Sequence, residues 1–320
     1  MNLSSVLRHF PTPTFLNPSH VGVSLSDFSL KMSKFGGTAP MLTIDTLLLP
    51  LEQGIVSSGV ILKPEEITKK IIEAKPKFHS DYAVFTIPDE FTYVFTATVP
   101  VVKAHDLTEA VAATLEENVP MSYEDTLFDF TPLSIVRAEK DYKAEVVVVA
   151  CVKREVEKLV GVLSSAGLEP LSCIPESQAV IEAVVPKDFS EDVCVVHARD
   201  NRVAIYLAKN RLVNFVTIRN VAKDNYEQDF LDEYSKFTEY VSKYGEMKHD
   251  QTLSIYVCGE FEYAKRVVLA LGGGTGRRGT KPVLANVWQN VFDISKHTPD
   301  LPYEVSLSFA GSVGAAISKV

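Results

Sequence analysis

The chain has 320 residues, of which 46% are apolar and 23% charged, and its formal net charge is −9. It is longer than one ordinary domain of ~100–200 residues, so two domains or one subdivided architecture is expected. An acidic protein gains nothing from the non-specific attraction of phosphate backbones. Nucleic acid is therefore excluded as the first candidate partner.

The cysteines and the apolar runs indicate the cellular compartment of the protein. None of the four cysteines forms a close pair with metal-ligand or redox spacing, and Cys151, Cys194 and Cys258 lie in apolar runs typical of buried strands. This usage predicts a reducing compartment. No apolar run approaches the ~20 residues that cross a bilayer. Residues 1–18 lack the apolar core of a signal peptide and are expected to form a flexible leader.

In chain order, the first part of the sequence predicts a β-hairpin, a third strand, a helix and a fourth strand. These elements are expected at 21–35, 42–51, 63–74 and 82–88. The hairpin turns at Ser26-Asp27, and the helix begins with a proline and two acids, as helix starts prefer.

The middle of the chain predicts strands alternating with helices. Strands are expected at 92–100, 128–136, 145–151 and 168–174, and helices at 106–117, 153–166 and 176–184. The helix at 153–166 has apolar residues at intervals of three and four and is followed by Gly167, a typical stop.

The last part begins again with three strands and then helices. Strands are expected at 193–196, 203–208, 212–218 and 253–258, an extended piece at 281–287, and helices at 224–248, 262–271 and 307–317. The repeated pattern of three strands and then a helix predicts two related α/β halves that face a cleft. Two unrelated α/β domains are the alternative.

The first hairpin carries the first motif. Residues 21–31 are VGVSLSDFSLK. In the actin and sugar-kinase superfold, the hairpin at this position has an aspartate that helps to place a metal ion and turn amides that hold phosphate. The pilus protein PilM and the division protein FtsA have V-G-hydrophobic-D-hydrophobic-G-S-x-x-hydrophobic-K there. Gly22 and Lys31 match this pattern, whereas Ser24 stands in place of the Asp and Ser26 in place of the Gly.

Further stretches follow in the order and spacing of the PilM family. Residues 147–179 resemble the family's strand, helix, A-G-L and following Glu…Ala on a helix, and residues 109–129 resemble its E-x-E-x-x-I-P stretch. Residues 192–219 resemble its second phosphate hairpin, and 310–318 its closing helix of small residues. The chain thus resembles the type IV pilus assembly protein PilM family, which is actin-like and related to FtsA, over roughly residues 20–320.

The resemblance implies an α/β fold of the actin-like ATPase type. Its two halves would be duplicated and ribonuclease H-like, with an inserted α/β subdomain of the FtsA and PilM kind. The expected boundaries are 19–90 with 175–190 for the first actin-like subdomain, 91–174 for the insertion and 191–320 for the second half.

The nucleotide motifs depart from the family pattern. The second hairpin has VVHA at 195–198 where the family has D-I-G-A, and Gly259 is followed by Glu260 where the family has two glycines. Magnesium favours carboxylates, and both expected carboxylates are absent. The resemblance implies a degenerate nucleotide cleft made by these residues: Ser24, Ser26, Asp27, Lys31, His197, Ala198 and Gly259. We therefore expect a pseudo-ATPase without catalytic residues, metal site or required cofactor, and ATP with magnesium is a disfavoured ligand.

A glycine-rich stretch, LGGGTGRRGTKP at 271–282, satisfies G-x-G-x-x-G. A genuine dinucleotide motif follows a strand and opens a helix. This stretch follows a predicted helix and leads into a proline, so it is interpreted as a flexible basic loop whose arginines could contact an acidic partner.

The resemblance implies a function. Proteins of the PilM family lie on the cytoplasmic face of the inner membrane and bind the cytoplasmic N-terminal segment of PilN, in a groove between the insertion and the first actin-like subdomain. We expect a non-catalytic cytoplasmic scaffold of a type IV pilus or related secretion machine. It would be peripheral to the inner membrane, touch the membrane through a PilN-like partner, and have the pilus motor ATPase as a further candidate partner.

Two alternatives stay open. The first is an actin-like nucleotide-binding protein with weak ATPase activity, which Ser24, Val195, His197 and Glu260 disfavour. The second is an FtsA-like cell-division protein. FtsA carries a C-terminal amphipathic membrane helix, and this sequence ends at Ser318-Lys319-Val320 without one.

Overall fold

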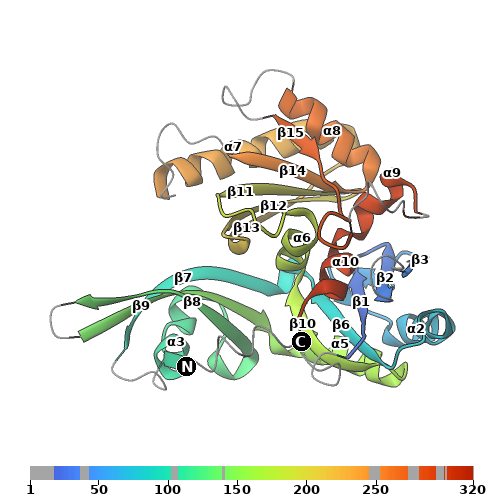
Figure 1. Cartoon of the computed structure of the whole chain (residues 1–320), viewed down its shortest axis with the longest axis horizontal. Coiled ribbons are helices and arrows are strands. Elements are labelled where there is room, and N and C mark those ends of the chain that lie inside the picture. The colour runs from blue at the N-terminus through green and yellow to red at the C-terminus, as the bar shows by residue number, and fades with distance from the viewer. Residues whose placement is uncertain are drawn as a thin grey trace, which may run out of the picture.

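Two five-stranded sheets form the frame of the molecule (Figure 1). The computed structural model describes residues 18–36, 43–101, 107–138, 141–244, 253–272, 281–292, 299 and 301–319. The first sheet has the order β10-β6-β1-β2-β3. Its strands are β1 (Val21–Leu25), β2 (Ser29–Gly36), β3 (Thr43–Pro50), β6 (Tyr82–Ile87) and β10 (Glu169–Pro175). The expected first hairpin is confirmed, because β1 and β2 pair antiparallel with Ser24 opposite Lys31.

The second sheet repeats the first. Its order is β13-β12-β11-β14-β15. Its strands are β11 (Val193–Arg199), β12 (Arg202–Lys209), β13 (Leu212–Asn220), β14 (Ser254–Gly259) and β15 (Pro282–Leu284). In both sheets the first strand pairs antiparallel with the second and parallel with the strand that follows a helix. The predicted duplication of three strands and a helix is therefore confirmed.

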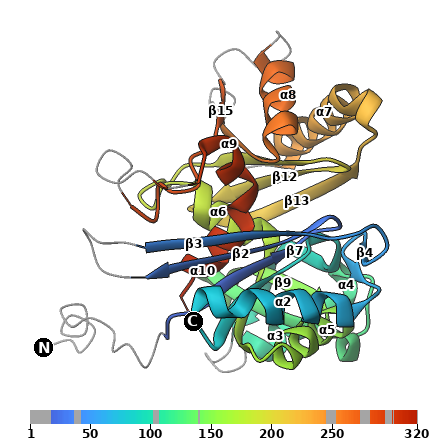
Figure 2. The ribbon, with the colours of Figure 1, turned by 90° about the vertical axis from the view of Figure 1, so that its right-hand side faces the viewer.

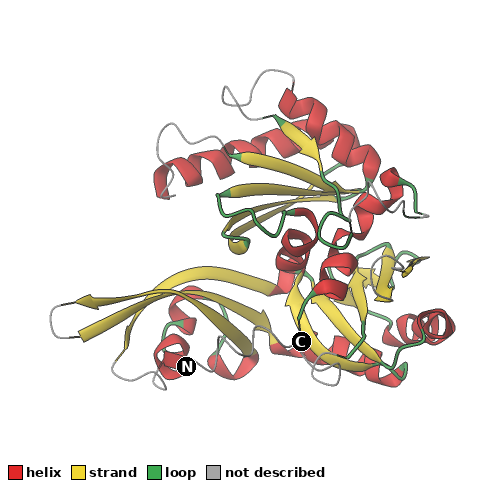
Figure 3. Ribbon diagram, in the orientation of Figure 1, coloured by secondary structure: helices red, strands yellow, loops and turns green. Residues whose placement is uncertain are grey.

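The helices lie in three layers around the two sheets (Figure 3). The outer face of the first sheet packs against α2 and α5, and the outer face of the second against α7 and α8. Between the sheets lie α6 and α10 (Figures 1 and 2). The helices are α2 (Pro64–Phe78), α5 (Lys153–Ser165), α6 (Glu176–Val184), α7 (Tyr226–Tyr244), α8 (Phe261–Gly272), α9 (Tyr303–Ser306) and α10 (Ala310–Ile317).

The two central helices cross with almost no space between their backbones. A Cβ added at Gly314 of α10 would lie 1.7 Å from the carbonyl oxygen of Ala179 in α6. On its other side α10 meets β1, where a Cβ at Gly22 would lie 2.1 Å from the carbonyl oxygen of Ser312. Small residues in α10 thus let one helix contact both α6 and the first sheet. The sequence AGSVGAAI has this composition for that reason.

A separate three-stranded sheet, β7-β9-β8, extends from the first half. It consists of β7 (Thr92–Val101), β8 (Thr126–Ala138) and β9 (Asp141–Val152), and it carries α3 (Leu107–Ala112) and α4 (Leu115–Asn118) on one face. This insertion reaches out beneath the second half (Figure 1). The short hairpin of β4 (Val56–Ser57) and β5 (Val60–Ile61) belongs to the first half.

Two expected boundaries are wrong. The insertion ends at Val152, not at 174, because α5 packs against α2 and β10 pairs with β6 in the first sheet. The second half does not run to 320, because α10 packs on β1, β2 and β6. Residues 1–17 of the predicted leader at 1–18, and residues 273–280 of the glycine-rich stretch, lie outside the described residues.

Candidate functional site

The turns of the two equivalent hairpins meet between the halves. Asn201, in the turn between β11 and β12, donates from Nδ2 to Oδ2 of Asp27 at 3.2 Å. The Arg202 guanidinium lies 3.6 Å from the same oxygen. The turn between β1 and β2 is therefore joined to the second half through the side chain of Asp27.

Asp27 is also fixed within its own half. Its carboxylate accepts hydrogen bonds from the backbone N–H groups of Ser58 and Gly59, at 3.0 and 2.9 Å. Burial acts to raise the pKa of Asp27, but these bonds and the Arg202 charge together hold the pKa below its usual value. Asp27 is thus an ionised carboxylate whose acceptor positions are taken by protein groups. The neighbouring Ser26 hydroxyl bonds within the turn, to Ser29.

A buried ion pair joins β11 to the first residue of α6. Nη2 of Arg199 lies 3.2 Å from Oε2 of Glu176, and Nη1 donates to Oε1 at 3.3 Å. Both side chains are at most 8% exposed. Burial raises the pKa of Glu176 to about 7, although the Arg199 charge acts to lower it. This pair is a deeply buried charge contact between β11 and the central helix α6.

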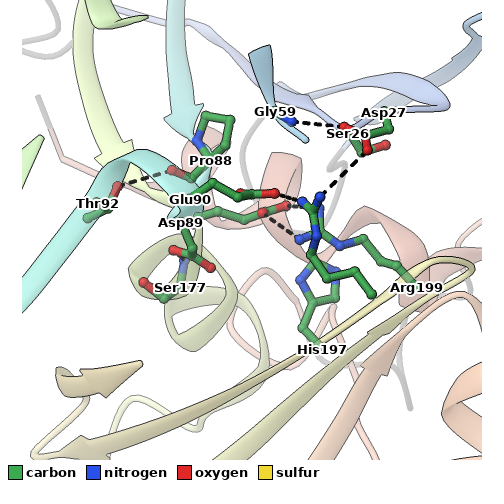
Figure 4. A network of polar contacts seen from close by, with 12 residues as sticks. Ser26, Asp27, Gly59, Pro88, Asp89, Glu90, Thr92, Ser177, His197 and Arg199 are labelled. Carbon is green, nitrogen blue, oxygen red and sulfur yellow. Dashed lines mark hydrogen bonds and ion pairs between the residues drawn. The ribbon is translucent and has the colours of Figure 1, made fainter. Parts of the chain in front are cut away.

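A hydrogen-bonded cluster continues from this pair toward the insertion (Figure 4). Tyr206 donates its hydroxyl hydrogen to Oδ2 of Asp89 at 2.7 Å, and the backbone N–H of Ser177 donates to Oδ1 at 2.9 Å. The Tyr206 oxygen also lies 3.4 Å from Nδ1 of His197. Burial, with the charges of Arg199 and Lys31, keeps the pKa of His197 well below its ordinary value, so the imidazole is neutral at neutral pH.

The segment that leads into the insertion takes part in the same network. Glu90, next to Asp89, contacts the Arg202 guanidinium. Arg202 therefore touches a carboxylate of the first turn and a carboxylate at the base of the insertion. The three structural units meet at one arginine.

Lys31 lies deeper between the halves. Its side chain is 7% exposed, and on β2 it stands opposite Ser24 of β1. Burial lowers the pKa of its ammonium group, while the charges of Glu260 and Glu176 act to raise it and that of Arg199 to lower it. Lys31 is a buried cation among carboxylates, rather than a surface lysine.

The backbone geometry at position 259 requires a glycine. It has φ +107°, and a Cβ added there would lie 2.0 Å from the carbonyl oxygen of Ala198. That oxygen accepts the backbone N–H of Glu260 at 2.8 Å. Glycine is required because the end of β14 lies directly against β11. Its presence therefore does not depend on a nucleotide.

The first hairpin carries Ser24, Ser26, Asp27 and Lys31, the second carries His197 and Ala198, and Gly259 ends the neighbouring strand β14. Sequence reasoning missed Arg199, Arg202, Asp89, Glu90 and Tyr206 as members. One signal was present, since two arginines flank a two-residue turn inside strands that are otherwise apolar, and buried arginines are rare unless they are paired. Their partners lie on α6 and at the base of the insertion, which local patterns do not show.

A groove lies beside this network, between the insertion and β13. Its volume is about 370 Å³. It is lined by Asp89, Glu90, Thr92, Tyr93, Val94, Phe95, Asn118, Val216, Thr217 and Ile218. The resemblance implied a groove between the insertion and the first half. In this groove the segment that leads from β6 into the insertion supplies the base through Asp89 and Glu90, and the second half supplies one wall.

The sequence profile of the family described as "Type IV pilus assembly protein PilM" matches residues 22–246. The chain belongs to the PilM family. No curated protein matches it significantly. Over the part of this PilM-family chain that the structure describes, no helix is long and apolar enough to cross a membrane. No three histidine, cysteine or carboxylate side chains in that part are placed to share a metal ion.

Solved structures confirm the fold. The structure described as "PilM-PilN type IV pilus biogenesis complex" is 16% identical, with a TM-score of 0.77, and the match covers 94% of this chain and 98% of the other. The ethanolamine utilization protein EutJ from Carboxydothermus hydrogenoformans is 13% identical, with a TM-score of 0.51, and the match covers 96% and 90%. The PilM-family chain therefore has the expected actin-like ATPase fold.

The pKa of Glu176 gives a testable pH dependence. Because this carboxyl binds its proton more tightly when folded, with a pKa of about 7 against 4.5, its contribution to stability is complete below pH ~4.5 and is lost as the pH rises to about 7. We expect Glu176→Gln to remove this fall. Melting temperatures of both proteins between pH 4.5 and 8 measure it. Parallel curves would show that Glu176 titrates normally.

Proposed function

We propose that this PilM-family chain is a non-catalytic scaffold of a type IV pilus or related secretion machine, which binds the cytoplasmic N-terminal segment of a PilN-like inner-membrane protein. It would work at the cytoplasmic face of the inner membrane and contact the membrane through that partner. The pilus motor ATPase is a second proposed partner, through which the scaffold would connect the membrane components to the motor.

The contact between the two hairpin turns supports the absence of catalysis. In an actin-like nucleotidase, phosphate lies between these turns. Here Asn201 and Asp27 are at hydrogen-bond distance, 3.2 Å, so no phosphate group fits between them. The carboxylate that remains, Asp27, is held by four protein groups. The residues present do not fit magnesium and a triphosphate, and no cofactor is proposed.

The family and the groove support the partner. A protein of the same fold is described in a complex with PilN. The groove of this chain lies at the base of the insertion, is walled by Tyr93, Phe95, Val216 and Ile218, and has no lysine or arginine among its lining residues. Cytoplasmic segments next to a membrane span are rich in lysine and arginine. A chain of net charge −9 attracts such a segment.

A titration tests the absence of nucleotide binding. With ATP and magnesium at millimolar concentration, we expect no heat of binding and no rise in melting temperature, because side chains of both halves fill the space between the turns. Binding at micromolar concentration would contradict the proposal. In that case Lys31→Ala should weaken it, and a slow ATPase would become the leading function.

A further inference from the structure

The free edge of the first sheet is an apolar strand. β3 is the last strand in the order β10-β6-β1-β2-β3, and its sequence is TIDTLLLP. It lies at the right-hand side of the molecule in Figure 1, above α2, and no second described strand pairs with it (Figure 2). The side chain of Leu48 is 41% exposed. Because an edge strand has unpaired N–H and C=O groups, β3 offers both main-chain bonds and an apolar surface to a further strand.

The register determines which groups of β3 point outward. The N–H of Leu51 donates to the carbonyl of Phe28, toward β2, at 2.8 Å. In an antiparallel ladder the direction alternates with each residue. Odd-numbered residues of β3 therefore bond to β2, whereas even-numbered residues, such as Thr46 and Leu48, direct both backbone groups away from the sheet. A second contact agrees, because Nζ of Lys77 in α2 reaches the outward carbonyl of Thr46 at 2.7 Å.

Two outward positions of β3 lack one hydrogen-bonding group each. The carbonyl of Thr46 is already bonded to Lys77, and Pro50 has no N–H to donate. Lysine and proline on an edge strand commonly prevent pairing with another chain. Here the two missing groups are complementary. If a second β3 runs antiparallel with its proline opposite Thr46, the carbonyl that is taken faces the N–H that does not exist.

We propose that two copies of the chain associate through β3, as antiparallel strands related by a two-fold axis at Leu48. The two Leu48 residues exchange both main-chain bonds, and the N–H of each Thr46 donates to the carbonyl of Pro50 of the partner subunit. The two five-stranded sheets become one continuous sheet. This proposal does not depend on the proposed function.

The side chains of β3 fit the same register. Leu47 stands opposite Leu49 of the partner subunit, in a pair without main-chain bonds, where side chains are closest. Both leucines are partly buried against the core beneath α2 in each copy. Leu48 stands beside Leu48 of the partner subunit on the other face of the sheet. The three consecutive leucines are thus covered by one another.

Other arrangements fit less well. A shift by one residue sets the outward groups against groups that already bond to β2. A shift by two residues separates Thr46 from Pro50 of the partner subunit, so that a bond is lost at both positions. A strand of another protein with a residue other than proline opposite Thr46 brings an N–H whose acceptor is taken by Lys77. The edge is therefore most complementary to itself.

The first test is sedimentation velocity of the full chain, from low micromolar to several hundred micromolar, in reducing buffer so that the exposed Cys173 forms no disulfide. One pair of strands is a small interface, so we expect a dimer with a micromolar dissociation constant. Leu48→Lys and Leu48→Asp should each weaken dimerisation at least ~10-fold, because like charges then face each other at the axis. Leu269→Lys, at a more exposed leucine on α8, is the matched control and should change dimerisation less than ~2-fold.

Mixing the two charged variants tests the register. Lysine in one copy then faces aspartate in the other, so an equimolar mixture should recover most of the lost association. A wild type that stays monomeric throughout would show that Lys77 and Pro50 protect a free edge, and would overturn the proposal. Dimers that the Leu48 variants do not weaken, or a mixture that does not recover, would overturn it as well.

Hydrogen exchange gives a measurement on the unchanged protein. Dilution from the dimer to the monomer should speed exchange of the Thr46 and Leu48 N–H groups at least ~10-fold, because these groups lose their partners. The N–H groups of Leu47 and Leu49 bond to β2 and should change much less. Equal changes at all four residues, or no change at any of them, would contradict pairing through this edge.

Discussion

Replacing Arg199 by methionine should lower the free energy of unfolding by about 3–5 kcal/mol. The change removes the guanidinium that pairs with the buried Glu176 carboxyl, and only the more weakly interacting Lys31 cation remains near it. Glu176 will respond by keeping its proton to a higher pH, so the loss should be greatest in alkaline buffer and smaller near pH 5. Urea denaturation at several pH values measures both effects.

Arg219→Met is the matched control. Arg219 also pairs with a carboxylate, Asp229, at 2.9 Å, but both side chains are partly exposed. Loss of this exposed pair should cost about 0–1 kcal/mol.

The double variant Arg199→Met with Glu176→Met should recover much of the stability that Arg199→Met alone loses, because both buried charges are then gone. A cost near zero for Arg199→Met alone would show that the ion pair does not hold the hairpin to α6.

Replacing Gly314 by alanine should destabilise the protein by about 3 kcal/mol or more, at or above the upper end of ordinary overpacking. The new methyl group would lie 1.7 Å from the carbonyl oxygen of Ala179, which is backbone and cannot rotate away. The two central helices must move apart, and both sheets pack on them. A thermal melt gives the change in stability.

The matched control is Gly161→Ala in the exposed part of α5, where a Cβ meets nothing within 4 Å. Alanine there should raise the free energy of unfolding by about 0.5–1 kcal/mol, since alanine is the better helix former. If both glycine variants were neutral, the close crossing of α6 and α10 would be wrong.

Local pattern was sufficient to predict most elements. The helix expected at 176–184 has these bounds in the structure, and the hairpin turn at Ser26-Asp27 is confirmed. Apolar alternation and helical spacing depend on the residues of one segment. These two patterns can therefore be recognised in the sequence without knowledge of the tertiary structure.

What the sequence did not reveal depends on pairing over long distances. The strand at 169–175 follows the insertion in the chain but pairs with β6, some ninety residues earlier, so the boundary at 174 was wrong. Arg199 and Glu176 are 23 residues apart and lie on a strand and a helix. No spacing rule connects such positions. The resemblance assigned Gly259 to a degenerate nucleotide cleft, and its close contact with Ala198 is visible only in three dimensions.

The position of α10 has a consequence for biosynthesis. This helix covers β1, β2 and β6, which are made first, yet it follows the whole second half in chain order. While a ribosome is still translating residues 191–306, α6 can cover part of β6 and β10, but the apolar inner surface at β1 and β2 still lacks α10. Proteins generally fold from the N-terminus as domains emerge. This one must wait, so a chaperone that shields exposed apolar surface would act on the nascent chain during that interval.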